Sequence, residues 1–190
     1  MSEYHDSSRI VRLSIRVTLT SQGLSQIVLE PWPEQESPAP AASYRISVYL
    51  HGHRRHGGEL TTRLEMFRKD LEAYFSGQPV DFLKYPVDWH GMTPFVRKVL
   101  DRARSIPWGE VQTYGWLSAQ IRLPRSARAV GGALRRNPVP VVIPCHRILR
   151  KGGQMGGFSA GIQWKKFLLD LESPPKTLTV ESIEFIESIG

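Results

Sequence analysis

The chain has 190 residues, a formal net charge of +7 and 41% hydrophobic residues. Such a length suits one large domain or two small ones, and the composition excludes a disordered, fibrous or membrane-embedded protein. No apolar run is long enough to span a membrane, and the first ten residues lack the apolar core of a secretory signal. The single cysteine, Cys145, excludes an internal disulfide and suits a reducing compartment, so we expect a cytoplasmic protein, or a nuclear one if the source is a eukaryote.

The positive charge is concentrated in one segment. No Asp or Glu occurs between Glu110 and Asp170, whereas the rest of the chain has a net charge of 15 − 18 = −3. The segment contains ten basic residues, which are Arg122, Arg125, Arg128, Arg135, Arg136, Arg147, Arg150, Lys151, Lys165 and Lys166. This distribution is typical of a surface that meets a polyanion, although a solvated basic face would look the same.

The N-terminal half predicts a small sheet and one helix. Residues 11–18 alternate apolar and polar side chains, as expected for a strand with one buried face, and a turn at Gln22-Gly23 leads to a second strand. A proline-rich loop precedes a third strand, and a helical pattern ends at Gly77. The predicted elements are strands 11–18, 25–29 and 44–50 and a helix over 60–75.

The C-terminal half predicts helices around a cysteine loop. Thr93 can cap a helix that has Pro94 in its first turn. Two further helices, 114–121 and 126–136, are joined by a tight turn, which is a helix-turn-helix pattern. Asn137-Pro138 ends the second of them, and an extended run then leads to the cysteine. The remaining predicted elements are the extended run 139–143, a glycine-rich loop 152–161 and a helix 162–171; no element is predicted in 176–190.

The helix 126–136 has an unusual surface. Gly131 and Gly132 each cost about 1 kcal/mol relative to alanine inside a helix, and three alanines lie beside them. Such a bare surface lets a backbone approach closely, either that of another helix or that of a nucleic acid. Arg128 and Arg135 on the same helix favour DNA. The lack of Asn and Gln favours shallow approach and insertion over reading of base edges.

Cys145 has two interpretations. A lone cysteine is usually an inert buried side chain. Here His146 and Arg147 follow directly and a basic helix precedes, and neighbouring cations lower the thiol pKa that controls nucleophilicity. Adjacent side chains in extended backbone point in opposite directions, so contact would require an irregular turn or a bridging water. Glu172 is a candidate to orient His146.

These motifs resemble one family. Pro144-Cys145-His146-Arg147, the preceding Asn137-Pro138-Val139-Pro140 and the run from Ala127 to Ala133 closely resemble O6-alkylguanine-DNA alkyltransferases. The likeness extends to 107–114, to Gly156-Gly157-Phe158-Ser159 and to 168–172, and more faintly to 70–77.

The resemblance implies a role for each matching residue. Cys145 is the alkyl acceptor, His146 draws the thiol proton through a water and is oriented by Glu172, and Tyr114 donates a proton to the departing guanine. Asn137 is the hinge between the recognition helix and the cysteine loop. Arg128 fills the stack when the damaged nucleotide is flipped out through the minor groove. The resemblance also implies DNA contacts by Ala127, Ala129, Gly131 and Arg135, and substrate contacts by Ser159, the carbonyls of Cys145 and Ile148, Phe158 and Met155.

The resemblance also implies a fold class, domain boundaries and partners. We expect an α+β protein with a small ribonuclease-H-like α/β domain (1–85), a connector (86–91), a mostly helical, winged-helix-like domain with a helix-turn-helix (92–175) and a tail (176–190). The partner would be double-stranded DNA containing O6-alkylguanine, with no cofactor, no metal, no membrane and a monomeric state. Some family members bind zinc through N-terminal Cys and His residues, and this chain has no second cysteine. The cluster His51, His53 and His56 has no cysteine or acidic residue among it and is expected to be a polar loop.

Two other classes of function compete. An alkyltransferase-like protein that only binds lesions and recruits repair factors commonly has tryptophan in place of the cysteine, whereas Cys145 is present here. A helix-turn-helix transcription regulator would read bases specifically, yet helix 126–136 lacks Asn and Gln, and no dimerisation segment is evident.

Overall fold

The computed structural model describes residues 10–33, 43–52, 57–173 and 179–189. Its larger sheet contains four strands in the order β2-β1-β3-β6, and β1 runs antiparallel to β2 but parallel to β3. Alternate β1 side chains such as Leu13 and Val17 are buried, whereas Arg12 and Arg16 are exposed, which confirms the predicted alternation. The strand bounds are β1 Ile10–Thr20, β2 Gly23–Leu29, β3 Ser43–Gly52 and β6 Thr179–Ile189.

The fourth strand is a correction to the sequence analysis, which predicts no element in 176–190. β6 pairs with β3 in parallel along its length, with one register shift at Tyr44/Arg45. Apolar and polar residues alternate only from Ile183 to Phe185, and Ile186 then breaks the alternation. A strand at a sheet edge needs only one paired side and few buried residues, so its sequence pattern is weak.

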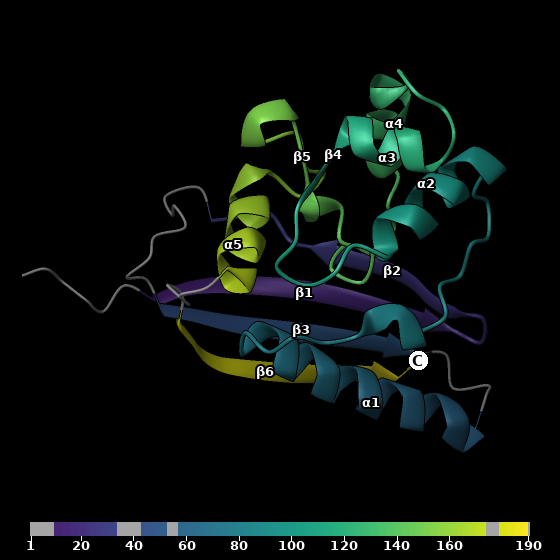
Figure 1. The fold of residues 1–190 in the computed structure, drawn as a ribbon. Helices are drawn as coiled ribbons and strands as arrows, with labels where there is room; N and C mark the ends of the chain where they lie inside the picture. Colours follow the sequence, from purple (N-terminus) through teal and green to yellow (C-terminus); the bar gives the residue numbers. More distant parts are fainter. Residues whose placement is uncertain (1–9, 34–42, 53–56, 174–178, 190) are drawn as a thin grey trace, which may run out of the picture.

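A long helix runs along the sheet and confirms the predicted 60–75 helix with an earlier start. α1 (Gly57–Phe75) contacts β3 and β6 (Figure 1). It ends where Gly77 adopts φ +73°, a left-handed conformation that glycine adopts without a Cβ penalty. The amide of Gln78 then donates to the Ala73 carbonyl at 2.9 Å and closes the last turn.

The described residues of the C-terminal half form four α-helices. α2 (Pro94–Arg104), α3 (Tyr114–Gln120) and α4 (Ala127–Leu134) pack on one another, and α5 (Ile162–Glu172) stands on the sheet (Figure 1). The Thr93 hydroxyl accepts from the Val96 amide at 3.4 Å, as the predicted cap requires. A two-stranded parallel ribbon joins β4 (Gln112–Thr113) to β5 (Ile148–Leu149). None of the helices in the described ranges is both long and apolar enough to cross a bilayer.

Two predicted elements differ. The 126–136 helix ends at Leu134, and the amides of Arg136 and Asn137 donate to carbonyls three residues earlier, so the chain tightens before Pro138. The predicted extended run 139–143 forms only one isolated bridge between Pro140 and Ile143. Val141 has φ +75° there, which a β-branched residue rarely adopts, so the run is a turn and not a strand.

The seam between the two halves is aromatic and hydrogen-bonded. Trp32 packs against Trp164 and Phe167 of α5 with ring centroids 5.4 and 5.8 Å apart. The Trp164 indole donates to the Glu30 carbonyl at 2.6 Å, and the Ile27 amide donates to the Pro138 carbonyl at 2.8 Å. The sheet therefore supports the cysteine loop from behind, in a mixed α/β architecture.

Candidate active site

A cavity of about 1410 Å³ lies between the helix-turn-helix and the glycine-rich loop. Its walls come from the start of α3, one face of α4, the cysteine turn and the loop 157–159. Of the predicted site residues, the cavity is lined by Cys145, Tyr114, Ala127, Arg128, Gly131, Arg135, Phe158 and Ser159. The chain thus brings its only cysteine to the same hollow as the basic helix.

Cys145 sits in a 3₁₀ turn over Cys145–Arg147 and is only 6% exposed. The backbone at the cysteine is therefore an irregular turn and not an extended strand. The Asn137 side-chain nitrogen donates to the Cys145 sulfur at 3.1 Å and to the Ile143 carbonyl at 2.8 Å. The Asn137 oxygen accepts from the Val139 amide at 3.0 Å. Asn137 therefore connects the end of α4 to the cysteine turn.

Burial raises the pKa of Cys145 to about 11, and the Asn137 hydrogen bond and the Lys165 charge only partly oppose it. This corrects the expectation that the adjacent Arg147 lowers the thiol pKa. The Arg147 guanidinium pairs with Glu172 and is not among the groups that shift the thiol pKa. The resting side chain is therefore a protonated thiol that needs a base.

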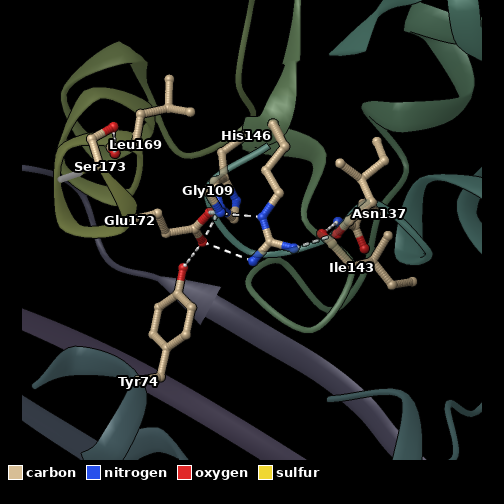
Figure 2. Close-up of polar contacts among 10 residues, drawn as sticks. Tyr74, Gly109, Asn137, Ile143, His146, Leu169, Glu172 and Ser173 are labelled. Carbon is tan, nitrogen blue, oxygen red and sulfur yellow. Dashed lines mark hydrogen bonds and ion pairs between the residues drawn. The ribbon is translucent and has the colours of Figure 1, made fainter. Parts of the chain in front are cut away.

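His146 is fully buried and contacts Glu172. Its Nε2 lies 2.8 Å from Glu172 Oε1 (Figure 2). Since cationic and hydrogen-bonding neighbours hold the pKa of Glu172 far below its usual range, the carboxylate can only accept, and Nε2 carries the proton. Nδ1 is buried without a hydrogen-bond partner, so its lone pair is available for a proton.

Three more polar side chains are buried beside these residues. The sequence analysis gives no role to Tyr74 or Lys165 and expects Arg147 only to lower the thiol pKa. Arg147 donates to Glu172 through Nε at 2.7 Å and Nη2 at 2.9 Å, and to the Ile106 carbonyl through Nη1 at 2.5 Å. Tyr74 of α1 donates to Glu172 Oε1 at 2.6 Å (Figure 2). Lys165 is fully buried and donates to the Ile148 carbonyl at 2.6 Å. Burial lowers the pKa of Lys165 to about 8, and the nearby Cys145 opposes that shift.

Tyr114 is held against the glycine-rich loop. A Cβ on Gly156 would lie under 3.0 Å from the Tyr114 hydroxyl, so only glycine leaves room for the phenol there. Burial, followed by the neighbouring Cys145, raises the pKa of Tyr114. The phenol is therefore neutral and able to donate a hydrogen bond into the cavity.

The outer surface of α4 is bare and basic, as predicted. Arg128, Ala129, Gly132 and Arg135 are exposed. Of the ten basic residues in the acid-free segment, Arg147 and Lys165 are buried and serve the internal network. The other eight are exposed.

The remaining predicted residues lie around this center. Ile148 is buried behind the cavity, and its carbonyl accepts from Lys165. Met155 is 39% exposed and is not among the lining residues. Within the described part of the chain, no group of three His, Cys, Asp or Glu side chains could hold a metal. His51 lies in β3, whereas His53 and His56 fall outside the described residues.

The sequence matches a known family model. Residues 94–174 match "6-O-methylguanine DNA methyltransferase, DNA binding domain". A methylated-DNA–protein-cysteine methyltransferase from Methanopyrus kandleri is 39% identical over 127 residues, which cover 67% of this chain and 94% of that protein. The Haemophilus influenzae protein of the same name is 43% identical over 108 residues, or 57% of this chain and 60% of that protein.

Solved structures agree with the sequence matches. The OGT of Mycobacterium tuberculosis in complex with DNA matches with a TM-score of 0.60 and 26% identity, over 86% of this chain and 96% of that one. The O6-methylguanine-DNA methyltransferase of Pyrococcus kodakaraensis matches with a TM-score of 0.54 and 25% identity, over 84% and 98%. With its lone cysteine in the matched region, the chain belongs to the methylated-DNA–protein-cysteine methyltransferase family.

Proposed function

We propose that this protein repairs O6-alkylguanine in double-stranded DNA by transferring the alkyl group to Cys145. The sulfur attacks the alkyl carbon, the carbon–O6 bond breaks and a thioether forms, while the guanine oxygen gains a proton. A thioether has no acidic proton and is a poor leaving group, so each molecule repairs one lesion. No cofactor enters this balance.

One observation carries the proposal. The only cysteine opens into a cavity that it shares with a neutral phenol, Tyr114, and with the exposed Arg128. A nucleophile, a proton donor and a residue that can enter the base stack thus share one hollow. Such a pocket suits a flipped nucleotide, whose unstacking costs a few kcal/mol that inserted side chains offset.

The buried network supplies a proton path. The thiol proton passes through a water to Nδ1 of His146, whose Nε2–H is fixed by Glu172. Asn137 stabilises the thiolate through its hydrogen bond to sulfur. Tyr114 then gives its hydroxyl proton to the guanine, assisted at O6 by the Ser159 backbone.

DNA binding uses the surface of α4. Ala127, Ala129 and Gly131 allow this helix to approach the minor groove closely, and Arg128 fills the space of the extruded base. Arg135 contacts phosphate, so affinity falls with added salt. The carbonyl of Cys145, and that of Ile148 alongside its hydrogen bond from Lys165, would read the guanine amino group, and Phe158, which lines the cavity, would limit the size of the alkyl group.

We also infer two domains: a ribonuclease-H-like domain (1–85) whose sheet also takes in β6, a connector (86–91) and a winged-helix-like domain (92–175). The distinct sheet and helical halves support this division. We further propose that the protein is a monomer and acts in the cytoplasm, or in the nucleus if the source is a eukaryote.

The first test is mass spectrometry of the protein mixed with a duplex that contains one O6-methylguanine. One methyl group on the Cys145 peptide, saturating at one lesion per protein, is expected. Cys145→Ser should bind the duplex without modification. An unmodified wild-type protein that stays on the lesion would instead indicate the binding-only function. Preferential binding of one unmodified sequence would indicate a transcription regulator.

The second test concerns Arg128. Arg128→Ala should slow transfer from duplex DNA much more than transfer from free O6-benzylguanine, because only the duplex requires flipping. Arg97→Ala on α2 is the control, because this exposed arginine does not line the cavity and makes only surface contacts, an ion pair with Asp101 at 3.7 Å and a cation–π contact with Trp89. Equal losses on the two substrates would overturn the role proposed for Arg128.

A further inference from the structure

A tyrosine of the N-terminal sheet half reaches the carboxylate that orients the proposed base. Tyr74 belongs to α1, is fully buried and lies 98 residues before Glu172. Its hydroxyl and the Nε2–H of His146 donate to the same atom, Glu172 Oε1, at 2.6 and 2.8 Å (Figure 2). The Trp108 ring packs against the Tyr74 ring in a T-shaped arrangement, with ring centroids 5.1 Å apart.

Glu172 Oε1 has more hydrogen-bond donors around it than lone pairs to accept them. Arg147 Nη2 is a third donor at 2.9 Å, whereas an oxygen of a carboxylate has about two lone-pair sites. Each added donor reduces the negative charge that Oε1 offers to the imidazole. Tyr74 therefore competes with His146 for Oε1 and weakens the stabilisation of a protonated His146.

The charges around His146 make this competition matter. Glu172 and Lys165 face it from α5, Arg147 and Cys145 flank it in its own turn, and Tyr74 acts from α1 through Glu172. Burial holds the pKa of His146 below its ordinary value, Glu172 opposes that shift, and Arg147 and Lys165 add to it. The carboxylate is thus the one neighbour that favours the imidazolium.

We propose that Tyr74 is a positioning residue through which the N-terminal half keeps His146 neutral, with Nδ1 free to accept the thiol proton. The proposal rests on the proposed function, in which His146 is the base. It gives the sheet half a part in proton transfer in addition to supporting the cysteine loop. Tyr74 does not touch the substrate.

Tyr74→Phe removes one oxygen and keeps the ring. Tyr85→Phe is the matched control, because Tyr85 is also buried and also donates to a carboxylate, Asp70 at 2.5 Å, away from the cavity. The first measurement is an NMR titration of the His146 imidazole in the DNA-free protein. We expect its pKa to rise in Tyr74→Phe and to stay unchanged in Tyr85→Phe.

The second measurement is single-turnover transfer from free O6-benzylguanine at pH 5.5 and pH 8. A raised His146 pKa depletes the neutral base only at acidic pH, so Tyr74→Phe should lose more of its rate between pH 8 and pH 5.5 than the wild type and Tyr85→Phe do. A loss equal at both pH values, with an unchanged His146 titration, would show a merely structural role and overturn the proposal.

Site-specific replacement of Tyr74 by 3-fluorotyrosine keeps the hydroxyl and makes it a stronger donor, so it tests the proposal if Tyr74→Phe does not fold. The His146 pKa should then fall below that of the wild type, and a rise would contradict the proposal. The titration does not need activity. If the wild-type protein transfers no alkyl group, the proposed function is wrong. The titration would still show whether Tyr74 changes the pKa of His146.

Discussion

The side-chain nitrogen of Asn137 lies 3.1 Å from the sulfur of Cys145. The same side chain also bonds the backbone at both ends of the turn 139–143, through the Val139 amide and the Ile143 carbonyl. One buried amide therefore fixes the shape of the loop and stabilises negative charge on the sulfur. The position of the nucleophile and its chemistry depend on the same three hydrogen bonds.

Asn137→Ala should lower the free energy of unfolding by about 1–3 kcal/mol, because it leaves the buried Val139 amide without a partner and the Ile143 carbonyl with only the Cys145 amide. It should also raise the thiol pKa, since the Asn137 hydrogen bond lowers it. Urea unfolding and thiol titration measure the two effects. Asn137→Asp keeps the acceptor for the Val139 amide but places a buried carboxylate against the sulfur and the Ile143 carbonyl, so it should raise the thiol pKa further than Asn137→Ala and should not recover the stability.

The thiol titration itself gives a pH prediction. With the pKa of Cys145 raised to about 11, only a small thiolate fraction exists at pH 7. Alkylation by iodoacetamide in the absence of DNA should therefore rise about tenfold per pH unit from pH 7 to 10. The thiol of the unfolded chain ionises near pH 8.5, whereas the folded thiol stays protonated up to about pH 11. The free energy of unfolding should therefore fall as the pH rises through that range. A rate that levels off near pH 8 would contradict the buried, protonated thiol.

Lys165 should shift that titration. Its charge lowers the thiol pKa, so Lys165→Met should raise the pKa of Cys145 and slow alkylation at pH 8. Its neighbour Lys166 is exposed, and Lys166→Met is the matched control, expected to alkylate as the wild type does. Equal rates in Lys165→Met and the wild type would show that the buried ammonium serves only the Ile148 carbonyl.

Gly156 tests the placement of Tyr114. Gly156→Ala introduces a Cβ under 3.0 Å from the phenol hydroxyl, so the ring must move and transfer should slow by roughly 10- to 100-fold. Gly157→Ala is the control, because a Cβ there meets nothing within 4 Å. Single-turnover kinetics on O6-methylguanine duplex compare the two. Wild-type rates in Gly156→Ala would mean that Tyr114 is not needed where the structure holds it.

The sequence predicts the parts of the site that lie in contiguous motifs. Cys145 and His146 are adjacent, Asn137 precedes them by a few residues, and Glu172 comes from a helix with clear apolar periodicity. Tyr74 and Lys165 escape prediction for a physical reason. Each occupies an ordinary helical position, and only tertiary packing brings Tyr74 to Glu172 and buries Lys165 beside Cys145.

The strands show the same limit. β1 and β3 bury alternate side chains over eight or more residues, and this pattern predicts them closely. β6 joins the sheet mainly through backbone pairing with β3, and backbone hydrogen bonds leave no pattern of residue types. Helix ends are likewise better predicted where a cap such as Thr93 exists than at Leu134, where the chain tightens without one.

The contribution of β6 to stability can be measured at two adjacent positions. Phe185 is half-buried and lies under the Arg68 guanidinium, 5.3 Å from its ring centroid, whereas Ile186 is 38% exposed. Phe185→Ala should lower the free energy of unfolding by about 1–2 kcal/mol, less than for a fully buried ring, and Ile186→Ala by less than about 0.5 kcal/mol. Chemical denaturation measures these losses. Because α1 contacts β6 and also carries Tyr74, an NMR titration of His146 in Phe185→Ala would also show whether the loss of this contact changes the His146 pKa. Equal losses in the two variants would contradict the placement of β6 against α1, since successive residues of a strand point to opposite faces.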